Sequence, residues 1–478
     1  MTTKELKLTN MNSINTIPKL HFFNSRSKTN EVFTHPNEIP INIYTCGPTV
    51  YDIVHLGNLK TFLMSDFIVS LLQALGYKTN HIMNITDIDD KIIARLDEQT
   101  YESLIKYTSY YTEKFIEDID KLGIRNYNKN NIHKVTDNID TIEEMIITLM
   151  NKEFAYQVPD GSIYFDSTKV TNNPFHRNCD TSNYNSGRNI IRADGIRNNA
   201  DFVLWKVKED REIKFGKILK PGSCGWHIEC SAICANILDK VHISMGGSDL
   251  QTPHHECSIS QSEAYKPEQV YGNYWIHFGF LNFTGEKMSK SIGNVLRLDD
   301  IKHNYKLVRM YLLSKSYKNN VEYSDNEIQL MKKDFVNFHL LYNKLNNKFY
   351  KESKNSEQNY VGETNIYDKI LETVSNNIDT SNGLKILFDY VNKFMKVYLT
   401  TEIANTILIE LNRINNLFNI LDEKLLFIDE NTLVFIKERD EFRKLKQFDK
   451  TDIMRDKLKK TFIFEDENTG FSLIKKFD

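Results

Sequence analysis

The chain has 478 residues, of which 40% are hydrophobic and 12% aromatic, and a chain of this length is expected to fold into two to four domains. The formal net charge of −3 at pH 7 excludes a protein that coats nucleic acid with its whole surface, although it allows a local basic face. The sequence has no apolar run near twenty residues and no signal-peptide core, so we expect no membrane contact and a cytoplasmic location.

Cysteine usage points to reduced thiols. The chain contains six cysteines, Cys46, Cys179, Cys224, Cys230, Cys234 and Cys257. In a long chain without an export signal, such residues are expected to be free thiols or metal ligands and not a disulfide framework.

A strand–turn–helix pattern is predicted close to the N-terminus. Residues 41–46 are a short, β-prone apolar run, which Gly47-Pro48 interrupts. Apolar residues at helical spacing follow as far as Gly76, a suitable C-terminal cap. Residues 78–85 then predict a second strand, which completes a βαβ unit of a parallel sheet. The helix start in such a unit is well placed to bind phosphate.

The remaining segments differ in character. Residues 1–19 are polar and are expected to be a surface extension, whereas residues 91–125 read as a helix. A mixed, asparagine-rich stretch follows at residues 126–221. Beyond about residue 320, long amphipathic runs such as 328–345 and 403–421 predict a helical bundle.

Two short strings carry a family resemblance. His55-Leu56-Gly57-Asn58 lies at the predicted helix start, and Lys287-Met288-Ser289-Lys290-Ser291 lies in a glycine-flanked segment far downstream. Together they resemble the signatures of class I aminoacyl-tRNA synthetases, usually spelled HIGH and KMSKS. The strings ITDIDDK at residues 85–91 and PGSCGWHIECS at residues 221–231 resemble the cysteinyl-tRNA synthetases in particular. These strings span most of residues 40–315.

The resemblance implies a fold and a domain order. We expect an α/β, Rossmann-like catalytic domain with a connective insertion, then an all-α helical bundle and a small C-terminal anticodon-binding domain. The expected boundaries are residues 20–125 for the first catalytic half, 126–221 for the insertion, 222–320 for the second half with the KMSKS region, 321–425 for the bundle and 426–478 for the C-terminal region.

The resemblance also implies a reaction. It is the ATP-dependent activation of L-cysteine to cysteinyl-adenylate, followed by transfer to the 3′-terminal adenosine of tRNA(Cys), by a monomer that uses Mg²⁺ with ATP. Negative charge builds on the phosphates during activation, and the protein must neutralise it. His55, Lys287 and Lys290 are the expected catalytic residues. The expected ATP contacts are Gly47, His55, Gly57, Asn58, Gly247, Asp249, Lys287, Ser289 and Lys290.

A zinc site is implied at the floor of the amino-acid pocket. Its expected ligands are Cys46, Cys230, His254 and Cys257, and the expected cysteine contacts are Cys46, Gly47, Thr86 and Trp226. Zinc binds sulfur well and a neutral hydroxyl poorly, so it can select the thiol of cysteine over serine.

The fourth ligand is open, because the family places a glutamate where this chain has Ser258. Cys257 shares a helical face with His254 and can replace that glutamate. His255 is a weaker substitute.

Other readings remain open. Asn58, Ser244 and Ser258 stand where the family has histidine, histidine and glutamate, which keeps alive a catalytically silent paralogue that binds tRNA or zinc. A second alternative joins cysteine to a non-tRNA amine. Residues 439–464 carry a cluster of basic side chains that resembles the family's anticodon-binding end, and the alternative is a plain helical surface. The cluster comprises Arg443, Lys444, Lys446, Arg455, Lys457, Lys459 and Lys460.

Overall fold

The computed structural model of the protein describes most of the chain. The described residues are 17–128, 130–170, 194–288, 293–346, 365–395, 397, 399–426, 428, 430–467 and 470–477. Most of the predicted N-terminal extension, Cys179, and Ser289, Lys290 and Ser291 of the second signature therefore lie outside them.

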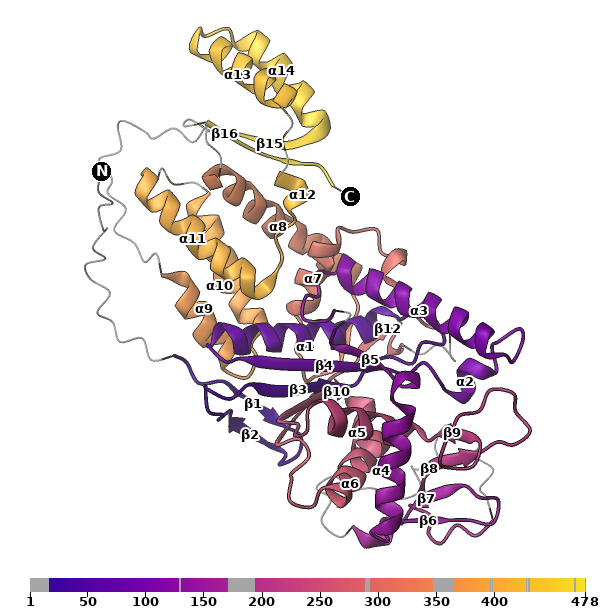
Figure 1. The fold of residues 1–478 in the computed structure, drawn as a ribbon. Helices are drawn as coiled ribbons and strands as arrows, with labels where there is room; N and C mark the ends of the chain where they lie inside the picture. The colour runs from indigo at the N-terminus through magenta and orange to yellow at the C-terminus, as the bar shows by residue number, and fades with distance from the viewer. Residues whose placement is uncertain are drawn as a thin grey trace, which may run out of the picture.

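A parallel sheet organises the catalytic part (Figure 1). Its central strand, β3 (Ile41–Thr45), lies between β4 (Thr79–Ile85) and β10 (Ile243–Gly247). Outside these are β5 (Ile132–Lys134) and β11 (Tyr274–Phe278), giving the order β11-β10-β3-β4-β5. Consecutive strands run outward from β3 on one side and then resume at β10 on the other. Open α/β sheets bind ligands at the carboxyl ends of the strands beside such a reversal.

The predicted helix after Gly47 is α1 (Leu56–Ala74). Its apolar side chains are buried along almost the whole length, as expected for a helix packed on several sides. Gly76, with φ of +88°, follows the helix end and confirms the predicted cap.

Helices cover both faces of the sheet. Figure 1 shows α1 on one face and α4 (Ile139–Asn151), α5 (Trp226–Ile237) and α6 (Glu256–Tyr265) on the other. The expected single helix over residues 91–125 is wrong, because that segment contains α2 (Asp90–Ile93), a break, and α3 (Tyr101–Lys121). Thr100 accepts from the backbone N–H of Ser103 and so caps a new helix start within the run.

The insertion folds as a separate antiparallel sheet. Its strands are β6 (Ala155–Gln157), β7 (Ile163–Phe165), β8 (Phe202–Val207) and β9 (Gly222–Cys224), in that order. Both predicted bounds of the insertion, residues 126 and 221, differ from the sheets in the structure. Strand β5 lies after residue 126 but belongs to the central sheet, and β9 lies after residue 221 but belongs to the insertion sheet.

Smaller strand elements flank these sheets. A hairpin of β1 (His21–Asn24) and β2 (Thr29–Val32) precedes the central sheet. After it, β12 (Leu281–Phe283) pairs with β13 (Glu286–Lys287) and β14 (Val321–Glu322).

The C-terminal region is mainly helical, as predicted. The helices are α7 (Tyr305–Leu313), α8 (Asp325–Asn346), α9 (Ile366–Ser375), α10 (Thr380–Phe394), α11 (Thr401–Phe418), α12 (Glu423–Leu426), α13 (Glu430–Lys444) and α14 (Phe448–Thr461). A hairpin of β15 (Phe462–Glu467) and β16 (Gly470–Lys475) follows and joins α8 through a hydrogen bond from Asn343 to the carbonyl of Leu473.

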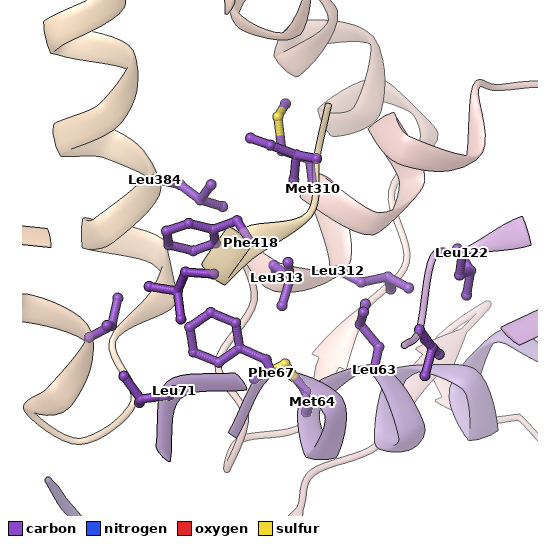
Figure 2. Close-up of a cluster of buried hydrophobic side chains, with 14 of the residues drawn as sticks. Leu63, Met64, Phe67, Leu71, Leu122, Met310, Leu312, Leu313, Leu384 and Phe418 are labelled. Atoms are coloured by element: carbon purple, nitrogen blue, oxygen red, sulfur yellow. The ribbon is translucent and has the colours of Figure 1, made fainter. Parts of the chain in front are cut away.

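The catalytic part and the bundle share one hydrophobic core. Figure 2 shows Leu63, Met64, Phe67 and Leu71 of α1 beside side chains of α7 and the bundle. The Phe67 and Phe418 ring centroids are 5.4 Å apart. Burial of this apolar surface fixes the bundle against the helix that begins at His55.

A buried ion pair crosses the same interface. Arg309 on α7 and Asp66 on α1 are both fully buried, with 3.0 Å between Nη2 and Oδ2. Arg309 also donates to the carbonyls of Leu122, Gly123 and Phe418. One guanidinium therefore joins α1, the end of α3, α7 and α11, with its charge compensated by Asp66.

No helix among the described residues is long and apolar enough to cross a membrane.

The buried pair generates a stability prediction. Arg309→Met should destabilise the protein by about 3–5 kcal/mol, because Asp66 would remain buried without its counter-charge. The urea midpoint, followed by tryptophan fluorescence, measures the loss. The control is Lys114→Met, which removes a half-exposed pair with Glu117 and should cost under about 1 kcal/mol. Equal midpoints for the two variants would contradict the assignment.

Candidate active site and metal centre

A cleft of about 510 Å³ opens at the carboxyl ends of β3 and β10, where the strand order reverses. It gathers residues from five separate segments of the chain. The predicted site residues that line it are Cys46, Gly47, His55, Gly57, Asn58, Trp226, Gly247, Asp249 and Lys287. A space of this volume is suited to a nucleotide-sized ligand.

His55 caps α1 at the edge of the cleft. Its Nδ1 accepts from the backbone N–H of Asn58 at 3.2 Å, while the Asn58 side chain accepts from the backbone N–H of His55 at 3.3 Å. With Nδ1 acting as acceptor, a neutral ring carries its proton on Nε2, from which it can be donated to a phosphate oxygen. Asn58 therefore orients His55, and it also lines the cleft, where ATP contact stays a prediction.

Gly57 makes room for this cap. A Cβ at Gly57 would lie 3.0 Å from Nδ1 of His55 and 3.5 Å from the carbonyl of Leu281. A side chain would therefore crowd the imidazole, which would have to shift by a few tenths of an ångström.

Lys287 begins the segment of the second signature at the cleft rim. Its Nζ lies 2.8 Å from Oδ2 of Asp249, and it stands 4.1 Å from the ring centroid of Phe280. Both partners of the ion pair are about half exposed, so the pair is weak and can open for an anionic ligand. Lys290 and Ser289, which follow, are outside the described residues.

Three predicted metal ligands converge below the cleft. Cys46 Sγ lies 3.9 Å from Cys230 Sγ and 3.5 Å from His254 Nε2, and Cys230 Sγ lies 3.3 Å from the same nitrogen. Tetrahedral zinc with Zn–S near 2.3 Å and Zn–N near 2.0 Å separates such atoms by roughly 3.8 Å for two sulfurs and 3.5 Å for sulfur and nitrogen. The three side chains therefore fit a zinc ion.

Neighbouring rings hold His254 in place. Its Nδ1 lies 3.1 Å from Nδ1 of His227, and its ring stacks on Trp226 with 4.3 Å between centroids. A hydrogen bond on the far nitrogen and a stacked face orient a ligating imidazole. Trp226 thus joins the predicted amino-acid pocket to the predicted metal centre.

The ionisation of the Cys230 sulfur depends on a cation. The adjacent Cys46 sulfur and burial raise the pKa of the Cys230 thiol well above its usual range. A divalent metal reverses this, because it binds the thiolate and displaces the proton.

Three neighbouring residues, Ser258, Cys257 and His255, are candidates for the fourth metal ligand. Ser258 donates its hydroxyl to the carbonyl of His254 at 2.9 Å, and Cys257 is buried. His255 belongs with Cys46 and His254 to a group whose ligand atoms all lie within 4.8 Å of one another. Burial lowers the pKa of His255 well below its usual value, so the imidazole is neutral.

A buried hydrogen-bond chain supports Thr86. Asn84 accepts from the Tyr44 hydroxyl and from the backbone N–H of Gly47, and donates to Thr86. Thr86 in turn donates to Oε2 of Glu229 at 2.9 Å. This chain fixes Gly47 and Thr86, the expected cysteine contacts, relative to each other.

The sequence interpretation missed Asn84 and Glu229. The signal for Asn84 was a polar residue within an apolar strand, and the signal for Glu229 was an acidic residue between the buried Ile228 and Cys230.

The chain matches a known family over most of its length. Residues 32–333 match the model of the tRNA synthetases class I (C) catalytic domain. Cysteine–tRNA ligase of Oceanobacillus iheyensis is 31% identical over 472 residues, covering 94% of this chain and 98% of that protein. Cysteine–tRNA ligase of Clostridioides difficile is 33% identical, covering 91% of this chain and 95% of that protein.

The chain belongs to the cysteine–tRNA ligase family. The resemblance inferred from the signatures is confirmed. Among solved structures, Mycobacterium tuberculosis methionyl-tRNA synthetase bound by methionyl-adenylate aligns with a TM-score of 0.56 at 12% identity, over 80% of this chain and 92% of that one. At this identity the likeness concerns the fold, and it confirms the Rossmann-like class I architecture.

The environment of Glu229 generates a second prediction. Burial raises its pKa well above 4.5, so the folded protein holds a proton that the unfolded chain releases. The contribution of Glu229 to the stability should therefore fall as pH rises above 4.5. Glu229→Gln mimics the protonated acid without this penalty, and its advantage over the natural protein in urea midpoint should be larger at pH 7 than at pH 5.

The matched variant is Glu229→Ala, which leaves Thr86 without its acceptor and should lose about 1–3 kcal/mol. A Glu229→Gln protein less stable than the natural one at pH 7 would mean that the carboxylate is ionised there.

Proposed function

We propose that the protein is a cysteine–tRNA ligase that activates L-cysteine with ATP and Mg²⁺ and transfers it to the 3′-terminal adenosine of tRNA(Cys). One observation carries the proposal. Cys46 belongs both to the wall of a nucleotide-sized cleft and to a triangle of zinc-binding atoms. Family membership supports the same reaction.

The proposed metal is zinc, held by Cys46, Cys230 and His254. Bound zinc would supply a Lewis acid that takes the substrate sulfur as thiolate. Serine has nearly the same shape, and packing alone separates such isosteres by roughly 1–3 kcal/mol. A neutral hydroxyl is a poor partner for a cation in a thiolate site, so the donor set itself provides the larger discrimination.

The proposed activation step depends on charge neutralisation. His55 donates from Nε2 to a phosphate oxygen, and Lys287 exchanges Asp249 for phosphate as ATP enters. Lys290 is proposed to act beside it. Each contact is stronger on the charged transition state than on bound ATP, which is the requirement for catalysis.

Thr86 is proposed to receive the substrate ammonium. The Thr86 hydroxyl donates a hydrogen bond to Glu229, and one of its two lone pairs accepts a hydrogen bond from Asn84. The remaining lone pair suits a donor, and the ammonium of cysteine is one.

The C-terminal helices are proposed to bind the anticodon region. Lys446 is exposed in the turn between α13 and α14, and Lys457 and Lys460 are exposed on α14. Phe448, close to Lys446 in the chain, is 59% exposed. Exposed cations with an aromatic ring suit phosphate contacts and base stacking. Lys444 forms an ion pair with Glu441, and Arg455 forms one with Asp452, each within its own helix. These two cations are therefore expected to contribute less to RNA binding.

Amino-acid-dependent ATP–pyrophosphate exchange tests the proposed activation step. We expect exchange with cysteine, and a kcat/KM for serine lower by more than the roughly 200-fold that packing alone provides. Exchange with neither amino acid, in folded and zinc-loaded protein, would favour a silent paralogue. Exchange without charging of tRNA(Cys) would favour a different amine acceptor.

The proposed metal site predicts the effect of Cys230→Ser. The variant should lose its zinc and its cysteine activation, because serine cannot supply a thiolate, and should bind ATP normally. Cys234→Ser is the matched control, since Cys234 is also buried and lies one turn further along α5. Zinc content is measured by elemental analysis. Equal zinc in both variants would place the metal elsewhere.

A further inference from the structure

His255 is a buried imidazole with one satisfied nitrogen. Its Nδ1 lies 2.8 Å from Nε2 of His277 on β11. Its Nε2 has no hydrogen-bond partner among the described residues, and the side chain is 1% exposed. A buried polar atom without a partner costs about 1–3 kcal/mol, so this nitrogen requires an explanation.

The His255 ring lies beside part of the cysteine cluster, namely Cys46 and His254. Ligand atoms of Cys46, His254 and His255 lie within 4.8 Å of one another. Strand β10 separates β11, which carries His277, from β3, which leads to Cys46. A ring whose Nδ1 points to His277 therefore turns its other nitrogen toward the side of Cys46.

Gly246 provides the space for this ring. A Cβ at Gly246 would stand 2.7 Å from Cε1 of His255 and 3.2 Å from its Nε2. Any side chain there would displace the imidazole. The absence of a side chain at Gly246 thus lets the His255 ring pack directly against the backbone of β10, next to the cluster.

Ser258 does not offer a comparable donor. Its hydroxyl already donates to the carbonyl of His254, within its own helix. A neutral hydroxyl is also a weak zinc ligand compared with an imidazole or a thiolate. Cys257 is the competitor with suitable chemistry, and the experiment below separates it from His255.

We propose that His255, through Nε2, is the fourth protein ligand of the metal bound by Cys46, Cys230 and His254. The inference rests on the proposed zinc site. Completing a tetrahedron requires the ring to move closer to the other ligands, above all to Cys230, which lies outside the group of ligand atoms within 4.8 Å of one another. His277 then acts as a positioning residue, since its acceptor nitrogen keeps the proton of His255 on Nδ1.

The ligand set has a consequence for the substrate. Two thiolates and two neutral imidazoles leave a zinc site with no net charge, whereas a carboxylate in place of one imidazole would leave it at −1. A neutral site repels an incoming cysteine thiolate less. The imidazole therefore favours the thiol-binding role of the metal.

X-ray absorption at the zinc edge of the full-length protein, without cysteine, is the first test. We expect two sulfurs near 2.3 Å and two imidazole nitrogens near 2.0 Å. Three sulfurs with one imidazole would assign Cys257 and overturn the proposal. Two sulfurs with one imidazole and water would also overturn it, because no fourth protein ligand would be present.

Matched variants give an independent readout. His255→Ala should weaken zinc binding about 10-fold or more in competition with a chelator, and His277→Phe should weaken it about 10–100-fold through loss of orientation. Cys257→Ser should retain the natural affinity. In cobalt-loaded protein, His255→Ala should change the ligand-field bands and leave the thiolate charge-transfer intensity unchanged.

The pattern of outcomes separates this proposal from the function on which it rests. Loss of affinity in Cys257→Ser and none in His255→Ala would overturn the assignment of His255 while keeping the zinc site. Absence of zinc from the natural protein, or zinc unaffected by Cys230→Ser, would overturn the zinc site itself.

Discussion

The buried pair of Asp66 and Arg309 is the constraint on which the arrangement of the catalytic part and the bundle depends. Asp66 stands in the middle of α1 and compensates an arginine that also binds the ends of α3 and α11. His55, which lines the cleft, is the N-cap of α1. The helix that positions His55 is therefore fixed at its centre against the bundle. A buried charge without its partner is costly, so the two parts have few alternative arrangements.

The cleft follows from the sheet that this helix covers. The strand order reverses between β3 and β10, so the loops after these strands diverge and leave a crevice. Cys46 follows β3 and Gly247 ends β10, while α5 and the segment Gln251–His255 that precedes α6 bring Cys230 and His254 beneath them. The metal triangle therefore draws on three segments that only the parallel sheet places together.

Two of the three departures from the family's signatures have local structural explanations, and the third, Ser244, has none. Asn58 replaces a histidine and forms a reciprocal cap with His55, so the first signature keeps an oriented imidazole. Ser258 replaces a glutamate and bonds to its own helix, while the neighbouring His255 has an unsatisfied nitrogen beside the cluster. Ser244 is buried, and its hydroxyl has no hydrogen-bond partner in the part of the chain that the structure describes.

The sequence by itself determined the family, the fold class and nine of the 22 residues that line the cleft, because short strings such as His55–Asn58 and Gly225–Cys230 carry their chemistry locally. It also predicted β3, β4 and the cap at Gly76 from hydrophobic spacing. It missed the break between α2 and α3, where a local cap at Thr100 overrides a helical composition. Only the tertiary structure decided the hydrogen-bonding environment of Asn84, Glu229 and His255. Their contacts join residues far apart in the chain, and spacing along a sequence carries no information on which buried polar atom is left without a partner.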